Sequence, residues 1–465
     1  MTPRRAAALV GLGLALRILG LPLWGTFDTD EWKAWSSFAV REGLARVYGP
    51  PDRRILKLAA EASPASPLAG LLQVRWPRRN FEWQGVGRAV DYPPGSMIVL
   101  WLEGKLYQAI DPALPSDRRF NAVINLAPFL GSLAILALLW RSAAGPGPVR
   151  GLAFWLNPAV LLAAPVLGYQ DPVFGALALA AVLALMDRRY VLASTLVAAA
   201  GFVKPQGVLL LPALATLVLR EAGWRTWLRC ALAGLGVGVL VFLPWWSQGY
   251  LLSALDGAFR PLGESDLSPL GLNLWWAAGY AMRWAQQGAW PEAAIVKAGA
   301  FRDWAGFAPG KLAGLLLLVG TAAVVWLLLR IPRHPEQRSE GSDRRWIIPL
   351  AVILQVHVYA FCALAVHENH TLLGVFLAPL LIGVWPRAKT VVAATSALAF
   401  ANLVLALRFG EGITTRGWFL GLQHLPMADA LFVLGALAHG ALLVWLCVSA
   451  TTILPSSRRS GAGRS

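Results

Sequence analysis

Long apolar runs recur from one end of this 465-residue chain to the other. Each approaches the ~20 residues that an α-helix needs to cross the hydrocarbon core of a bilayer. In lipid a segment must satisfy its own backbone N–H and C=O groups, which favours helices. The composition, 57% hydrophobic and 14% charged, is too apolar for a water-soluble domain. We therefore predict an all-α, polytopic membrane protein with about 12 transmembrane helices. The predicted spans are residues 6–24, 121–140, 151–167, 173–186, 190–203, 207–220, 230–246, 311–329, 347–366, 371–385, 390–407 and 429–450.

The basic residues are best explained as topology signals. The formal net charge is +16, but lysine and arginine gather in short connections between apolar runs, so nucleic acid is not expected as a partner. With the N-terminus in the cytoplasm, the arginine-rich connections fall inside. The short turns 168–172, 204–206 and 367–370 then fall outside and hold a single lysine, as the positive-inside rule predicts. We expect a multi-pass protein of the plasma (inner) membrane with both termini cytoplasmic.

Two long segments are predicted on the outer side, 25–120 and 251–310. Residues 93–110 are apolar enough to suggest a span, but a crossing there would move the later arginine-rich connections outside. We interpret this stretch as an interfacial helix on the outer surface. The expected organisation is an N-terminal membrane module with its loop (1–250), the second outer loop, and C-terminal membrane helices (311–465).

Acidic, amide and histidine residues that look functional concentrate on the predicted outer face. They are Asp28, Asp30, Glu31, Lys33, Asp91, Tyr92, Gln170, Asp171, Lys204, Gln206, His367, Glu368 and His370. Charged groups near membrane depth are costly unless they are paired or face water, so these clusters predict one shared polar site. Carboxylates can deprotonate a hydroxyl or hold a cation, and Lys204 and His367 can neutralise a phosphate leaving group.

Several of these residues also have a simpler structural explanation. The stretch 28–30 can be a helix cap, and the Pro-Pro pair at 93–94 suits the first turn of a helix. An isolated lysine such as Lys204 can extend along apolar surface to reach the interface. His357, expected near the middle of the membrane, is better explained as a hydrogen-bonded packing residue than as a catalytic one.

Three short motifs resemble those of a known superfamily. Residues 28–35 (DTDEWKAW) are similar to a D-x-[DE]-x-x-[RK]-x-W stretch in the first luminal loop of the dolichyl-phosphate-glucose-dependent glucosyltransferases of N-glycan assembly. Residues 91–94 (DYPP) and 366–368 (VHE) resemble two later motifs of these enzymes. The Pro-Pro element also resembles the protein mannosyltransferases and the lipid A aminoarabinose transferases, which are all members of the GT-C superfamily.

The resemblance implies a GT-C fold whose large first extracytoplasmic loop carries interfacial helices. It implies an inverting transfer of a hexose from a polyprenyl-phosphate donor to a glycolipid, glycan or protein acceptor at the extracytoplasmic face of the bilayer. By position, Asp28 is the expected general base and Asp30 its motif neighbour, while the other polar residues are expected to bind the donor and its phosphate. No cofactor is expected to be required, although a DxD pattern suggests Mg²⁺ or Mn²⁺ held by Asp28 and Asp30.

The sequence departs from the glucosyltransferase pattern at two turns. Residues 168–171 (GYQD) stand where the eukaryotic enzymes have an HFQYN-like turn, and Asn369 replaces the usual lysine after His-Glu. These differences bear on the donor sugar and the acceptor, and they favour a bacterial relative.

Two other functions are compatible with this hydropathy. A lipid-linked-sugar flippase or other transporter usually places polar residues near the midplane and often has internal repeats. A polysaccharide polymerase or ligase would use arginine and histidine in a large outer loop. Carboxylates on one rim of the membrane favour a glycosyltransferase over both.

Overall fold

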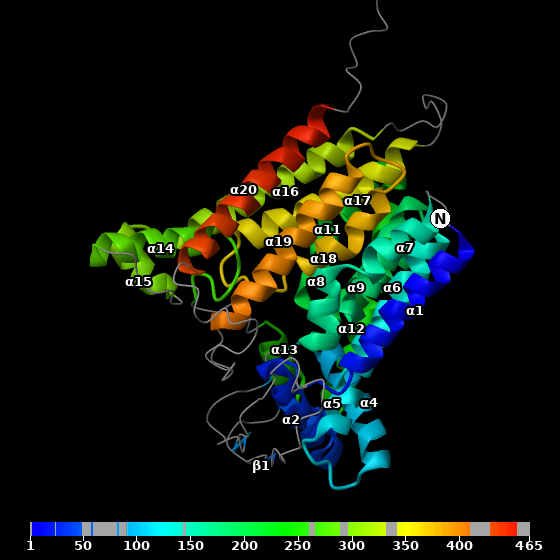
Figure 1. Cartoon of the computed structure of the whole chain (residues 1–465). Helices are drawn as coiled ribbons and strands as arrows, with labels where there is room; N and C mark the ends of the chain where they lie inside the picture. The colour runs from blue at the N-terminus through cyan, green and yellow to red at the C-terminus, as the bar shows by residue number, and fades with distance from the viewer. Residues whose placement is uncertain are drawn as a thin grey trace, which may run out of the picture.

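The computed structural model describes residues 2–23, 25–48, 57–58, 81–82, 90, 92–142, 146–259, 266–288, 296–331, 342–409 and 428–452. Helices dominate this part of the chain (Figure 1). The N-terminal half contains α1 (Pro3–Gly20), α2 (Phe27–Glu42), η1 (Leu44–Tyr48), α4 (Pro94–Ile110), α5 (Arg118–Ile124), α6 (Leu126–Arg141), α7 (Gly147–Trp155), α8 (Pro158–Leu161), the π-helical turn η2 (Leu162–Val166), α9 (Asp171–Met186), α10 (Tyr190–Val203), η3 (Pro205–Leu210), α11 (Leu211–Glu221) and α12 (Gly223–Trp246). The C-terminal half contains α13 (Leu251–Phe259), α14 (Leu274–Gln287), α15 (Ala298–Ala305), α16 (Pro309–Leu329), α17 (Ser342–Cys362), α18 (Leu372–Leu377), η6 (Ala378–Leu381), α19 (Ala388–Phe409) and α20 (Ala428–Thr452).

The segment between α2 and α4, predicted on the outer side, also carries a small antiparallel pair, β1 (Lys57–Leu58) and β2 (Phe81–Glu82). This pair is a minor addition to the expected all-α architecture.

Within the described residues, five helical stretches are long and apolar enough to cross a membrane. They are Arg118–Arg141, Gly223–Trp246, Pro309–Leu329, Ala388–Ala406 and Ala430–Thr451. A sixth follows if α7 and the α8–η2 segment, bent by 47° at their junction, form one span. Helix also covers most of each remaining predicted range. The membrane character and the helical class are thus confirmed, whereas twelve crossings and the GT-C fold stay predictions.

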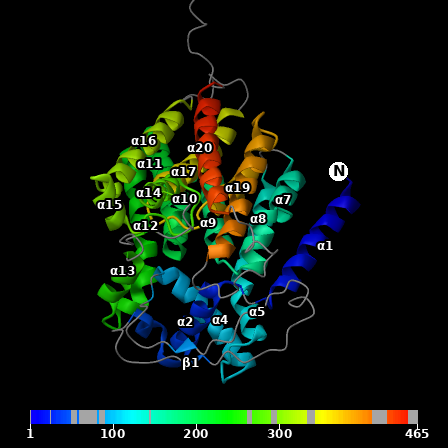
Figure 2. The ribbon, with the colours of Figure 1, turned by 60° about the vertical axis from the view of Figure 1, so that its left-hand side comes forward.

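Different elements lie at the two ends of the bundle. α1 runs from the N-terminus at one end to α2 at the other, where α4 and β1 also lie (Figures 1 and 2). Arg220, in the last turn of α11, donates to the carbonyl oxygen of Leu328 at the end of α16 (2.7 Å). Two helix ends that the positive-inside rule assigns to the same side therefore meet.

α4 corresponds to the stretch interpreted as an interfacial helix. It starts at Pro94, a residue type that suits the first helical position because its missing N–H has no intrahelical partner there. It packs along α2 and is not among the helices long and apolar enough to cross a membrane. Its buried Glu103 accepts a hydrogen bond from the backbone N–H of Ala127 in the first turn of α6 (3.1 Å).

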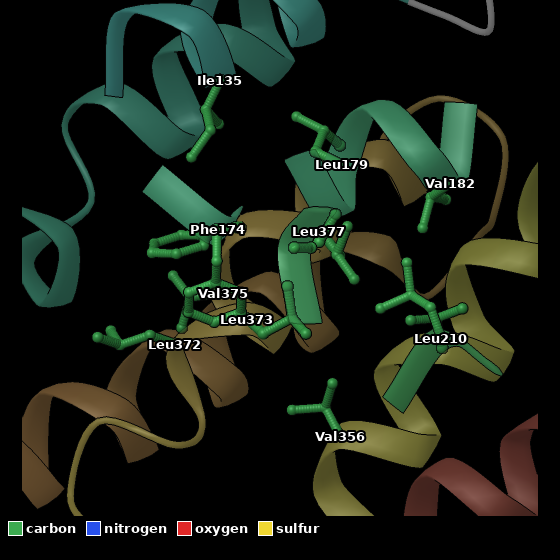
Figure 3. Close-up of a cluster of buried hydrophobic side chains, with 14 of the residues drawn as sticks. Ile135, Phe174, Leu179, Val182, Leu210, Val356, Leu372, Leu373, Val375 and Leu377 are labelled. Carbon is green, nitrogen blue, oxygen red and sulfur yellow. The ribbon is translucent and has the colours of Figure 1, made fainter. Parts of the chain in front are cut away.

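The main hydrophobic core joins the two halves of the chain. Figure 3 shows side chains of α6, α9, α17 and α18 meeting in it, among them Ile135, Phe174, Val356 and Leu373. All six residues of α18 are buried, as expected for a helix that is apolar on every side and enclosed by others. The central position of α9 and α18 brings the turns before them close together.

α1 is held to the bundle by a buried arginine. The Arg17 guanidinium lies over the ring of Trp155, 3.7 Å from its centroid, and donates to the Trp155 carbonyl oxygen (2.8 Å). That carbonyl lies at the end of α7, where the chain bends and Asn157 caps α8 instead. Arg17 thus satisfies an acceptor that the broken helix leaves open.

Candidate functional site

The start of α2 is fastened to the turn that precedes α9. The N–H of Thr26 donates to the carbonyl oxygen of Leu167 (2.9 Å). Gly25 has φ +71°, and a side chain there would meet the Leu167 oxygen at 2.9 Å. Only glycine therefore allows this close approach. The contact places the first turn of α2, which carries Asp28, beside the turn at residues 167–170.

Tyr169 lies at the centre of the site. Its hydroxyl donates a hydrogen bond to the carboxylate of Glu368, and both side chains are buried. Burial raises the pKa of Tyr169 well above its usual value, and the negative charges of Glu368 and Asp28 raise it further. The phenol therefore stays protonated and keeps its role as donor. The bond between Thr26 and Leu167 places Asp28, the predicted base, beside the turn that holds this tyrosine.

A buried ion pair adjoins the tyrosine. Lys204, between α10 and η3, contacts both carboxylate oxygens of Asp171 at 2.9 and 2.8 Å. The amide of Asn369 also donates to Asp171 (3.3 Å). A lysine ammonium has three N–H donors, so Lys204 keeps one after binding both oxygens. Its positive charge is already compensated by the aspartate.

The turn at residues 367–370 is held by neighbouring helices. Asn402 of α19 donates to the backbone oxygen of Glu368 (3.1 Å), and Tyr359 of α17 hydrogen-bonds to His370 (3.3 Å). Burial lowers the pKa of His370 well below its usual value, and nearby His367 and Lys204 lower it further. His370 is therefore neutral at pH 7. His367, on the same turn, is only half-buried.

Buried acceptor oxygens line these turns without donors. They belong to Gln170 (Oε1), Gln206 (Oε1), Glu368 (Oε2) and Asn369 (Oδ1), and none has a hydrogen-bond partner among the described residues. A buried acceptor without a donor costs about 1–3 kcal/mol. A ligand that donates several hydrogen bonds, such as a polyhydroxylated molecule, would satisfy them.

Other predicted site residues lie along α2 and its neighbours. The buried ammonium of Lys33 donates to the Ser116 hydroxyl just before α5 (2.9 Å), and Glu31 is also buried. The ring of Tyr92 packs against Trp32 and Trp35. These contacts place Lys33 and Tyr92 in the packing of α2. Asp91 and the side chain of Asp30 lie outside the described residues.

The part of the chain that the structure describes contains no group of three or more His, Cys, Asp or Glu side chains arranged to hold a metal ion. The suggested Asp28–Asp30 ligand pair stays a prediction, because the Asp30 side chain is not described.

Three contributors to the site were missed from the sequence. Tyr169 was noted only as part of a turn that departs from the family pattern, and Tyr359 was not singled out. Asn402 was overlooked although a lone amide in an apolar run is a recognisable signal of a buried polar contact. His357, by contrast, is hydrogen-bonded to His439 (3.1 Å) and Thr395, as expected of a packing residue.

No protein-family model matches this chain, and no curated protein matches it either. The function is therefore argued from the site itself.

Proposed function

We propose that this protein is a membrane glycosyltransferase that moves a hexose from a polyprenyl-phosphate donor to an acceptor hydroxyl at the extracytoplasmic face of the plasma membrane. One observation carries the proposal. Three carboxylates from distant parts of the chain gather around Tyr169: Glu368 accepts its hydrogen bond, and Asp171 accepts one from neighbouring Asn369. The bond between Thr26 and Leu167 brings the start of α2, with Asp28, beside the same turn. A positioned carboxylate can take the proton of a reacting hydroxyl group, which is the chemistry that glycosyl transfer requires.

Asp28 is the proposed general base. It lies in the first turn of α2 and its side chain is partly exposed, so an acceptor can reach it. The acceptor oxygen forms a bond to the anomeric carbon on the face opposite the phosphate, and its proton passes to Asp28. The bond between this carbon and the phosphate oxygen breaks, and polyprenyl phosphate leaves with the electron pair. A single displacement of this kind inverts the configuration.

The unpartnered oxygens support a sugar as the ligand. Gln170, Gln206, Glu368 and Asn369 each present a buried acceptor, and the hydroxyls of a hexose are donors that match them. A site built to receive hydroxyl groups rejects ligands that lack them, because its acceptors then stay unpaired.

The leaving phosphate is assigned to the cationic side of the site. Lys204 has one N–H beyond those that bind Asp171. His367 is half-buried on the same turn as His370, whose pKa is lowered by the charge of Lys204. A divalent cation held by Asp28 and Asp30 would add electrophilic stabilisation of the same phosphate.

The decisive experiment is transfer from radiolabelled polyprenyl-phosphate hexoses by the purified protein in liposomes, with a membrane extract as the acceptor source and with and without a chelator. We expect labelled product with wild type and a loss of about 100-fold or more in Asp28→Asn, the usual contribution of a general base. Asp187→Asn, an exposed aspartate on the turn between α9 and α10, is the matched control and should retain full activity.

Two outcomes would contradict this proposal. Full activity in a folded Asp28→Asn protein would remove the base assignment. Passage of the labelled lipid across the bilayer with its sugar still attached, unaffected by the substitution, would identify a flippase instead.

A further inference from the structure

α14 and α15 form an arm that projects from the side of the bundle (Figures 1 and 2). We use "the arm" for residues 266–288 and 296–308. Leu267, Trp275, Met282 and Phe301 of the arm form a small core with Ala313 of α16. Leu272 and Trp276 belong to the main core instead, and the ring of Trp276 stacks on Phe432 of α20. The arm also carries exposed apolar side chains, which need an explanation.

Large aromatic side chains on the arm face outward. Trp284 in the last turn of α14 is 52% exposed, Trp304 of α15 is 45% exposed, and Phe307 is 43% exposed. Ala300 and Trp304 lie one helical turn apart on α15 and are both exposed, and exposed Phe307 follows the end of this helix. We call these three residues the apolar stripe. Buried Phe301 of α15 packs against Trp275 (6.2 Å between ring centroids), and the rings of Trp304 (5.6 Å) and Phe307 (5.8 Å) also contact it.

The stripe leads directly into a membrane-spanning helix. Gly306, with φ +75°, ends α15, and α16 begins at Pro309. α16 is apolar enough to cross a bilayer, and its Leu315 and Leu318 are largely exposed, as lipid-facing residues are. Phe307 precedes Pro309 by two residues. The stripe therefore lies at the depth where the chain enters the membrane.

We propose that the arm lies in the headgroup region of the membrane, with Trp284, Trp304 and Phe307 embedded among the lipids. Tryptophan is enriched at this depth because its ring is apolar and its N–H is polar. Amphipathic helices of this type lie in the plane of the interface.

The charges of the arm suit a phospholipid surface. Lys297 pairs with Asp266, and Arg302 pairs with Asp303. Arg283 and the neighbouring Lys311 make no ion pair with any residue that the structure describes, which leaves the surface with two uncompensated cations. Arg283 also lines a small pocket with Ser268, Trp276 and Tyr280.

The arm is connected to the candidate site. The indole N–H of Trp275 donates to the carbonyl oxygen of Cys362 (2.7 Å), and the N–H of Ala365 donates to that of Leu267 (3.3 Å). A side chain at Gly271 would meet the Val366 oxygen at 2.7 Å. The segment before α14 thus packs on the residues that lead into His367.

Fluorescent labelling of single cysteines tests the proposal. Trp304→Cys and Phe307→Cys are compared with Asp303→Cys, an exposed neighbour, in a Cys447→Ala background, because Cys230 and Cys362 are buried. The labelled proteins are placed in liposomes that contain a lipid with a quencher near its headgroup, and iodide serves as the aqueous quencher. We expect lipid quenching at 304 and 307 to be severalfold stronger than at 303, and iodide quenching to be strongest at 303.

The same labels separate the alternatives. Equal iodide quenching at 303, 304 and 307 without lipid quenching would overturn the proposal. Protection from both quenchers, with energy transfer between labels that grows with the protein-to-lipid ratio, would overturn it in favour of a second copy of the chain. Trp284→Cys on α14 gives an independent measurement should a variant on α15 fail to fold. None of these readouts depends on sugar transfer.

Discussion

The phenol of Tyr169 donates its hydrogen bond to the carboxylate of Glu368, although the two residues are 199 positions apart in the chain. One belongs to the turn before α9 and the other to the turn before α18, and these helices pack against each other in the core. The bond therefore joins the N-terminal half of the protein to the C-terminal half at the candidate site.

Tyr169→Phe removes this bond and leaves a buried carboxylate oxygen without its donor. We expect a loss of about 1–3 kcal/mol in the free energy of unfolding and a lower kcat for sugar transfer. Tyr190→Phe is the matched control, because Tyr190 donates to Glu221 (2.6 Å) away from the site. Thermal unfolding and initial rates measure the two effects. Unchanged transfer in Tyr169→Phe would show that the bond is only structural.

The pair of Asp171 and Lys204 can be examined with a double-mutant cycle. Lys204→Met alone leaves a buried carboxylate uncompensated, and Asp171→Asn alone leaves a buried ammonium, so each is expected to cost about 3–5 kcal/mol. The double variant should cost less than the sum, because neither charge is left alone. Transfer should stay low in all three proteins. Additive stability losses would show that the two side chains do not interact in the folded protein.

His370 predicts a loss of stability at acidic pH. Its pKa is lowered by burial and by nearby His367 and Lys204. At mildly acidic pH the unfolded chain therefore binds a proton on His370, whereas the folded chain does not. The stability that neutral His370 contributes is fully present above about pH 6.5, the usual pKa of histidine, and it falls as the pH drops below this value. His370→Asn should show a smaller fall between pH 7 and pH 5 in thermal unfolding. Identical pH profiles would mean that the folded protein accepts the proton on His370.

Gly207 allows η3 to pack on α10. A Cβ there would lie 2.5 Å from the backbone carbon of Ala200, so Gly207→Ala should push η3 away and move Lys204 with it. We expect a destabilisation of about 1–3 kcal/mol and reduced transfer. The control is Gly236→Ala on α12, where a Cβ meets nothing within 4 Å. That change should be neutral or stabilising, since alanine favours helices. Equal unfolding temperatures for the two variants would contradict the packing argument.

Much of the architecture was predictable because hydropathy is a local property. The apolar runs fall on helices, and the interpretation of residues 93–110 as a separate helix agrees with α4, which lies beside α2. Helix length was less predictable, because tertiary packing decides where a helix breaks. The predicted span at 151–167 is interrupted by a bend between α7 and α8.

The site was predictable in part. The turns that contain Asp171, Lys204 and Glu368 were expected to converge, and the structure brings them together with Tyr169. The sequence did not predict that Lys204 pairs with Asp171. Its positive charge alone suggested a phosphate ligand, and the sequence does not show which carboxylate is close enough to compensate it. Lys33 was assigned to the donor from its motif position, whereas its ammonium contacts Ser116.

By itself the sequence determined that the chain belongs in a bilayer, and it predicted that its polar turns share a face. Both follow from the free-energy cost of placing charged groups in hydrocarbon. This cost applies to each segment separately, so it can be judged from the local sequence. Only the tertiary structure decided which polar groups meet, because hydrogen bonds act over about 3 Å. A pair such as Tyr169 and Glu368 exists only once α9 and α18 have packed side by side.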